Sequence, residues 1–142
     1  MARSEEKFDA VCSLEVLEHV DNPPSFLAAC SACLAPHGSI FLSTMNRTQK
    51  SRFLTITMAE HVLKMIPAGT HDWHKYITPS EMRTYLEGAG CDVVSMQGMV
   101  PDIDLMTLAW ECSPSAVVKR WRLSEKDWDV NYIVHAVRKI QD

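Results

Sequence analysis

The sequence predicts an α/β fold in which parallel strands are joined by helices. Residues 8–14 (FDAVCSL) and 39–44 (SIFLST) are short, apolar and rich in β-forming side chains, as in strands that are buried on both faces. Between them, apolar side chains recur at spacings of three and four residues, which is typical of a helix. A strand, a helix and a strand with short connections favour two parallel strands with a right-handed crossover.

The length and composition indicate one globular domain over residues 1–142. The 142 residues are 46% hydrophobic, which is enough for a single core. A formal charge of −4 gives no basic field, so we expect no nucleic-acid partner. The five cysteines are an odd number without two C-x-x-C units, which indicates reduced thiols inside a cell. No run reaches the roughly 18 apolar residues that cross a bilayer.

The helix between the two strands has signals at both of its ends. Asn22 and Pro23 supply a capping side chain and a first-turn proline. Pro36 follows the last apolar position, and we expect Gly38 to take a left-handed turn before the next strand.

The second half of the chain predicts two more helices and two more strands. An apolar helix face covers residues 53–66, and Thr78, Pro79 and Glu81 form the pattern of a capping box at the start of the next helix. Residues 91–96 and 130–137 are expected to be strands. We interpret residues 98–120, which hold two prolines and no clear period, as irregular structure with one short helix at most.

Glu15, Glu18 and His19 form the first candidate site, directly after the first strand. Their spacing of three and four residues would place all three on one side of a helical turn. Two carboxylates and an imidazole suit a divalent cation, with waters completing the shell that Mg²⁺ prefers. The alternative is that Glu15 contacts a ligand hydroxyl or a helix terminus, while Glu18 and His19 make structural hydrogen bonds.

The loop over residues 69–76 is the second candidate site. It concentrates histidine, acidic and aromatic side chains before a capped helix, and loops of this composition often line sites. His71 or His74 could act as a general base. Simple packing of the loop would explain the same residues.

Residues 53–66 could lie in a membrane interface, because Lys50, Arg52 and Lys64 flank the apolar helix face. A helix that covers the sheet would have the same face.

The order of these elements resembles the second half of an S-adenosylmethionine-dependent methyltransferase. The resemblance rests on the L-E-H-V run at residues 17–20 and on Leu34, Pro36, Gly38, Phe41, Ser43, Thr44 and Asn46. Residues 46–51 (NRTQKS), 67–73 (PAGTHDW) and 130–136 (VNYIVHA) narrow it to the ubiquinone-biosynthesis O-methyltransferases, which methylate catechol hydroxyls on polyprenylated rings.

The resemblance implies a partial Rossmann-like methyltransferase sheet, with the strands equivalent to 4, 5, 6 and 7 of that fold. It implies that Leu14 closes over S-adenosylmethionine and that Glu15, Glu18 and His19 bind Mg²⁺. The segment over residues 45–76 would contact a membrane through residues 53–66, and the substrate would be a polyprenylated catechol. The implied location is the matrix side of the mitochondrial inner membrane in a eukaryote, and otherwise the cytoplasmic membrane surface, with a ubiquinone-biosynthesis complex as a further partner.

Two differences from the family pattern leave two hypotheses for this chain. The glycine-rich turn after strand one and the acidic residue after strand two have no counterpart here, and residues 100–119 replace a shorter connection. The first hypothesis is a truncated methyltransferase, the carboxyl-terminal half of such an enzyme. The second is a non-catalytic module that docks onto a membrane or a biosynthetic complex. Because half a sheet leaves an open edge, we also predict self-association or poor solubility.

Overall fold

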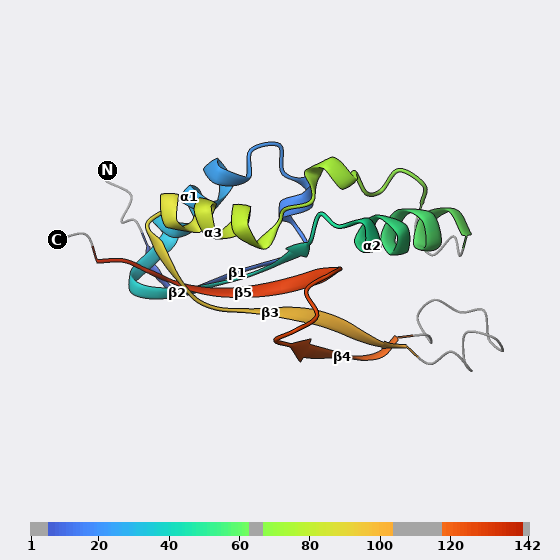
Figure 1. The fold of residues 1–142 in the computed structure, drawn as a ribbon. Coiled ribbons are helices and arrows are strands. Elements are labelled where there is room, and N and C mark those ends of the chain that lie inside the picture. Colours follow the sequence, from blue (N-terminus) through green and yellow to red (C-terminus); the bar gives the residue numbers. More distant parts are fainter. Residues whose placement is uncertain (1–5, 63–66, 104–117, 141–142) are drawn as a thin grey trace.

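A computed structural model describes residues 6–62, 67–103 and 118–140 as a curved sheet with helices on one side (Figure 1). The five strands have the order β1-β2-β5-β3-β4. Their bounds are β1 (Phe8–Leu14), β2 (Leu34–Met45), β3 (Cys91–Ile103), β4 (Val118–Ser124) and β5 (Asn131–Arg138). The predicted α/β class and all four predicted strands are therefore confirmed, with a fifth strand added.

Strand directions follow from the connections. β1 and β2 are parallel, as predicted from the helix that joins them. β5 is antiparallel to both β2 and β3, and β4 is antiparallel to β3. The last strand of the chain therefore lies in the middle of the sheet, between β2 and β3.

Two helices cover one face of the sheet. α1 (Pro23–Cys33) and α3 (Pro79–Gly88) lie beside each other over this face in Figure 1 and are in contact. The short α2 (Gln49–Arg52), a π-helix η2 (Phe53–Val62) and two 3₁₀ turns, η1 (Leu17–His19) and η3 (Trp73–Lys75), lie between the strands and helices in sequence. None of the described helices is long and apolar enough to cross a membrane.

The starts of both long helices are capped by the predicted side chains. The Asn22 side chain accepts a hydrogen bond from the Ser25 N–H at 3.1 Å. Thr78 and Glu81 form the reciprocal capping box, and Arg47 pairs with the same Glu81 carboxylate. Each cap satisfies a backbone donor that the helix itself leaves free, which stabilises the helix by about 1 kcal/mol.

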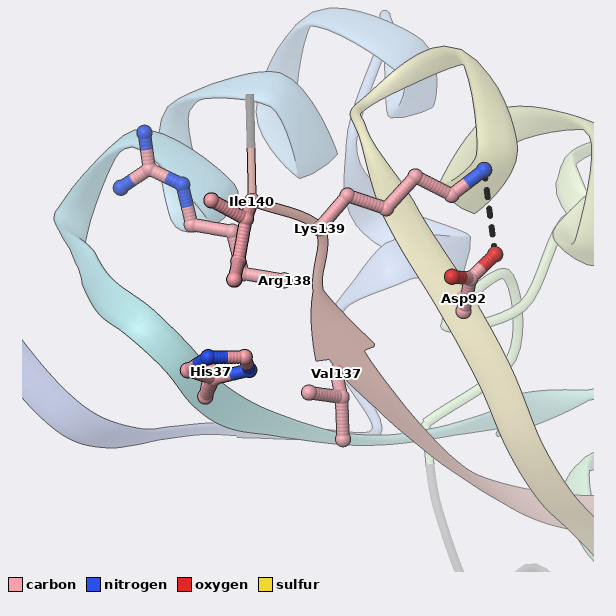
Figure 2. A pocket seen from close by; sticks show the side chains of 6 residues that line it. All are labelled: His37, Asp92, Val137, Arg138, Lys139 and Ile140. Carbon is pink, nitrogen blue, oxygen red and sulfur yellow. Dashed lines mark ion pairs between the residues drawn. The ribbon is translucent and has the colours of Figure 1, made fainter. Parts of the chain in front are cut away.

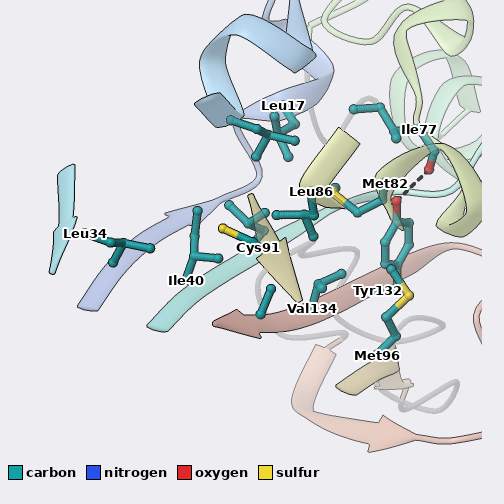
Figure 3. Packing of buried hydrophobic residues seen from close by; sticks show 13 residues of the cluster. Leu17, Leu34, Ile40, Ile77, Met82, Leu86, Cys91, Met96, Tyr132 and Val134 are labelled. Carbon is teal, nitrogen blue, oxygen red and sulfur yellow. Dashed lines mark hydrogen bonds between the residues drawn. The ribbon is translucent and has the colours of Figure 1, made fainter. Parts of the chain in front are cut away.

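The core lies between the helices and the covered face of the sheet (Figure 3). Leu27 from α1, Leu86 from α3 and Ile40 from β2 are fully buried members of one hydrophobic cluster. Burial of one such side chain contributes about 1.5–3 kcal/mol. Tyr132 of β5 is also fully buried, and its hydroxyl donates to the carbonyl oxygen of Ile77 at 2.9 Å, so no polar group of this side chain is left unpaired.

The prediction that Gly38 takes the left-handed conformation is wrong. β2 begins at Leu34, and His37, with φ of 62°, takes the left-handed conformation instead. Glycine is needed at position 38 for space, because a Cβ there would lie 2.9 Å from the Ala35 carbonyl oxygen and 3.0 Å from that of Phe8.

Two further predictions need correction. β3 continues to Ile103 and β4 begins at Val118, so the described parts of residues 98–120 are strand where we predicted irregular structure. Residues 104–117 lie outside the described residues. The predicted helix over 53–66 is a π-helix as far as Val62, and residues 63–66 also lie outside the described residues.

β1 is an edge strand with an apolar composition. It pairs with β2 on one side and with no strand on the other among the described residues. Phe8 and Leu14 at its two ends are half exposed. Such an edge offers backbone donors and acceptors to another chain, and self-association remains a prediction.

Candidate active site

Glu15 follows β1 directly and is held in an unusual backbone conformation. Its φ of 52° lies in the left-handed region, which costs a residue with a side chain about 1–2 kcal/mol. The Glu15 N–H donates to both the carbonyl oxygen and the Oγ of Ser43, each at 3.1 Å. Its carboxylate accepts from Ser43 Oγ at 2.6 Å and from Asn131 Nδ2 at 2.9 Å. Two neighbouring strands therefore fix both the backbone and the carboxylate of Glu15.

Glu18 lies in the 3₁₀ turn η1 and is buried, with 3% of the residue exposed. Its Oε2 accepts a hydrogen bond from Thr44 Oγ1 at 2.7 Å. Burial raises the pKa of the neighbouring Glu15, and the negative charge of Glu18 raises it further, against the lowering effect of the Ser43 and Asn131 hydrogen bonds. The net result is a raised pKa for Glu15, so the two carboxylates share one electrostatic environment.

Glu60 of η2 is a buried carboxylate that the sequence analysis did not identify. Its Oε2 accepts from the Gly69 N–H at 2.7 Å, and its Oε1 accepts from the His71 N–H at 2.9 Å and lies 3.0 Å from His71 Nδ1. Burial raises the pKa of Glu60, but the hydrogen bonds from Gly69 and His71 and the charge of His71 lower it below its usual value. Glu60 is therefore ionised. In the sequence, the signal that could have identified Glu60 was an acidic residue inside an apolar helical run.

Tyr76 lies near enough to Glu15, Glu18 and Glu60 for all three charges to act on its hydroxyl. The residue is buried, and its hydroxyl lies 2.7 Å from Thr55 Oγ1. Burial raises the pKa of Tyr76 to about 12, with further contributions from the charges of Glu60, Glu18 and Glu15. The phenol therefore stays protonated near neutral pH.

The two candidate histidines differ sharply in their surroundings. The His71 side chain is 11% exposed, and its ring lies 6.2 Å from that of Tyr76 and 6.1 Å from that of His19. His74 is exposed and its ring neighbours Trp73. The structure therefore brings His71, but not His74, into the group that contains Glu60 and Tyr76.

The predicted magnesium ligands are close in sequence but do not form a ready cation site. Within residues 6–62, 67–103 and 118–140, no three His, Cys, Asp or Glu side chains are arranged so that they could hold one metal ion. Both oxygens of Glu15 already accept hydrogen bonds from protein donors. His19 is exposed, beside the Glu15 and Glu18 pair. Magnesium binding by these three residues remains a prediction.

Leu14, the predicted cofactor contact, is 51% exposed at the carboxyl end of β1. Ligands of α/β proteins bind outside the carboxyl ends of parallel strands. The cofactor contact of Leu14 stays a prediction.

A separate pocket of about 520 Å³ lies at the other end of the sheet (Figure 2). His37 and Arg138 line it, and Lys139 pairs there with Asp92 at 3.0 Å. None of the candidate site residues lines this pocket.

Comparison with known proteins identifies the family. Residues 1–96 match the family described as methyltransferase domain. The chain belongs to this family.

Methyltransferases of ubiquinone biosynthesis are among the relatives of the chain. It is 41% identical over 137 residues to the ubiquinone biosynthesis O-methyltransferase of Hahella chejuensis, which covers 96% of this chain and 52% of that protein. It is 38% identical over 136 residues to the mitochondrial ubiquinone biosynthesis O-methyltransferase of Dictyostelium discoideum, which covers 96% of this chain and 38% of that protein. The predicted resemblance is confirmed. The chain spans about half the length, or less, of the curated relatives it matches.

Solved methyltransferase structures share the fold. A methyltransferase of Thermotoga maritima, a possible histamine N-methyltransferase, aligns with a TM-score of 0.60 at 11% identity over 98% of this chain and 59% of that one. Magnesium protoporphyrin IX methyltransferase from Synechocystis, with bound SAH, aligns with a TM-score of 0.51 at 16% identity over 98% of this chain and 50% of that one. The Rossmann-like methyltransferase fold of the chain is thereby established.

Proposed function

We propose that the chain corresponds to the carboxyl-terminal half of an S-adenosylmethionine-dependent O-methyltransferase of ubiquinone biosynthesis. The substrate would be a polyprenylated catechol, of which one hydroxyl is methylated. The proposal is supported by relatives of that name at about 40% identity across nearly the whole chain. The observation that carries it is the fixed Glu15, tied to Ser43 and Asn131 at the carboxyl end of β1 beside the exposed Leu14.

S-adenosylmethionine would supply an activated methyl group on a sulfonium. Leu14 would pack against one side of it, because this side chain is exposed at the strand end where such ligands bind. Glu15, directly after Leu14, takes a left-handed backbone conformation at the end of this strand.

The protein has to orient one catechol oxygen in line with the methyl group and accept its proton. Transfer of a methyl group from sulfur to that oxygen, with the S–CH₃ electron pair left on sulfur, is the chemistry that S-adenosylmethionine would supply. The hydroxyl proton would pass to the imidazole of His71 or His74, the two sequence candidates, and then to water. We favour His71, because it lies within the group of Glu60 and Tyr76.

Magnesium binding by Glu15, Glu18 and His19 is proposed for the substrate-bound protein only, with catechol oxygens as additional ligands. In support, the charge of Glu18 raises the pKa of Glu15, and a cation would relieve this repulsion. The ion would polarise the phenolic oxygen. In calorimetric titrations with Mg²⁺ in the presence of catechol, we expect Glu18→Gln to weaken binding about tenfold or more. Equal affinity of the two proteins would contradict this ligand set.

Membrane contact through residues 53–66 is proposed as the way to a substrate with a long isoprenoid tail. Phe53, Leu54 and Val62 are exposed apolar side chains on η2, with Arg52 beside them. By analogy with the mitochondrial relative in Dictyostelium, we propose a peripheral position on the matrix side of the inner membrane in a eukaryote, and otherwise on the cytoplasmic membrane surface. A biosynthetic complex would be the natural assembly for such an enzyme.

The same exposed side chains favour the alternative, a non-catalytic docking module. Calorimetric titration with S-adenosylmethionine distinguishes the two functions. Micromolar binding is expected for the enzyme and would contradict the module. Binding to vesicles that contain anionic lipid, without any binding of S-adenosylmethionine, would contradict the enzyme for this chain.

A further inference from the structure

Glu60 is a buried acid near the candidate site, and two backbone N–H groups and one imidazole nitrogen converge on it. Its side chain is 1% exposed, although it lies on a helix whose neighbouring residues are partly open to solvent. A carboxylate is rarely buried without several donors, because its desolvation costs far more than that of an amide. Here the two backbone donors, the N–H groups of Gly69 and His71, come from one short loop, and Nδ1 of the His71 ring lies 3.0 Å from the same carboxylate.

The loop is shaped to present these donors. The Thr70 N–H donates to the Pro67 carbonyl oxygen at 3.3 Å, and Gly69, third in this turn, has φ of 83°. A positive φ at this position of a turn is adopted readily by glycine. A Cβ at Gly69 would meet nothing within 4 Å, so the glycine serves the backbone conformation and not the packing. The turn thereby aims the Gly69 and His71 N–H groups at one carboxylate.

The carboxylate decides which ring nitrogen of neutral His71 carries the proton. The lowered pKa of Glu60 keeps it ionised, and an ionised carboxylate can only accept hydrogen bonds. Nδ1, 3.0 Å from Oε1, must therefore carry the hydrogen. Nε2 then carries the lone pair of the ring, and no group in the described part of the chain is hydrogen-bonded to it.

The His71 ring faces the candidate site. Its neighbouring rings are those of His19 and Tyr76, and it lies close enough to Glu15 for its protonated form to lower the pKa of that carboxyl. The Tyr76 hydroxyl is already occupied by Thr55 Oγ1, so it does not need Nε2 as an acceptor.

We propose that Glu60 is a positioning residue that fixes Nε2 of His71 as the hydrogen-bond acceptor for a hydroxyl of the aromatic substrate. This inference rests on the proposed function, because it takes the substrate to be a phenol or catechol. Glu60 itself contacts no substrate. Its role is to hold the ring, set the tautomer and tie the loop over residues 67–71 to η2.

The tautomer can be measured directly on the whole chain by ¹⁵N NMR of labelled histidine. We expect neutral His71 to carry its proton on Nδ1. The amide introduced by Glu60→Gln could either accept from Nδ1 or donate to it, so this variant should give a mixture of tautomers, and Glu60→Asp should restore the single form. A protonated Nε2 in the unmodified protein would overturn the proposal.

Ligand binding tests the acceptor role, with catechol as the probe and 1,2-dimethoxybenzene, which has no hydroxyl donor, as its partner. We expect His71→Asn to weaken catechol binding about tenfold and to leave 1,2-dimethoxybenzene binding unchanged. This variant keeps a short amide near the Nδ1 position, and the backbone donors to Glu60 remain. His37→Asn, the same substitution in the distant pocket of Figure 2, is the matched control and should bind both probes normally.

The outcomes separate this inference from the proposed function. The role of Nε2 would be overturned if His71→Asn lost affinity equally for both probes or kept its affinity for catechol. It would also be overturned if the unmodified chain did not bind catechol. The predicted tautomer and catechol selectivity without S-adenosylmethionine binding or methyl transfer would count against the proposed function alone. A thermal melt of each variant shows whether it is folded. If Glu60→Gln does not fold, the binding experiment with His71→Asn still tests the acceptor role of Nε2.

Discussion

Replacement of Ser43 by alanine should loosen the Glu15 turn and destabilise the protein by about 1.5 kcal/mol. The Ser43 hydroxyl donates to the Glu15 carboxylate at 2.6 Å, and a hydrogen bond to a charged group contributes about 1.5–3 kcal/mol. We take the lower value because the residue Glu15 as a whole is exposed to solvent, which screens its charge. The Glu15 N–H keeps its second acceptor, the Ser43 carbonyl oxygen, so this donor is not left unpaired.

Ser13→Ala is the matched control for this experiment. Ser13 lies in β1 next to the turn, and within the described part of the chain its buried hydroxyl has no hydrogen-bond partner. Its removal should change the free energy of unfolding by less than about 0.5 kcal/mol, or stabilise the protein slightly. Urea unfolding measures both variants, and a thermal melt should show a fall of about 5 °C for Ser43→Ala. If both variants had the same stability, the hydroxyl of Ser43 would not hold the turn.

The pH dependence gives this prediction a second, independent check. The Ser43 hydrogen bond lowers the pKa of Glu15, so its loss should raise that pKa above the already raised value in the unmodified protein. At low pH, Glu15 is protonated in both proteins and the charged bond does not contribute. The destabilisation by Ser43→Ala should therefore grow as the pH rises through the pKa of folded Glu15. NMR titration of the Glu15 carboxyl measures the shift, and a lowered pKa in the variant would refute the reasoning.

Three further substitutions test the fold by urea unfolding. Gly38→Ala should cost about 1–3 kcal/mol, because its Cβ would lie 2.9 and 3.0 Å from two backbone carbonyl oxygens; an unchanged midpoint would contradict this crowding. Tyr132→Phe should cost about 1 kcal/mol through the lost bond to Ile77, and a gain in stability would count against that bond. Met82→Ala should cost about 2–5 kcal/mol, since the side chain is fully buried in the core, and a loss below about 1 kcal/mol would mean that the site collapses or is less well packed.

The sequence was most informative where local chemistry decides the structure. The capping box at Thr78 and Glu81 and the cap at Asn22 depend on residues within one turn of each other, and both were predicted correctly. The parallel pairing of β1 and β2 follows from the helix between them. The position of Glu15 at the end of a strand was likewise evident from a break in an apolar run.

What the sequence analysis missed depends on contacts between distant segments or on unusual patterns. β4 was not predicted, because Trp121 and Leu123 point to solvent and charged residues alternate with them, so burial leaves no clear signal. Glu60 was hidden in an apolar segment that we interpreted by its hydrophobic face. The partners of Glu15 in β2 and β5 could not be found by spacing, since only the sheet register brings them together.

The hydrogen bond between Glu15 and Asn131 joins residues 116 positions apart, across nearly the full length of the chain. During synthesis, the residues of the first strand and its turn leave the ribosome long before the strand that completes their surroundings. Because β5 lies between β2 and β3, these two strands cannot be joined in one sheet until β5 has been synthesised. Contacts of such long range slow folding and leave partly formed sheets exposed in the meantime. We therefore expect nascent chains that stop before residue 131 to lack the fixed Glu15, and to depend on chaperones more than the finished protein does.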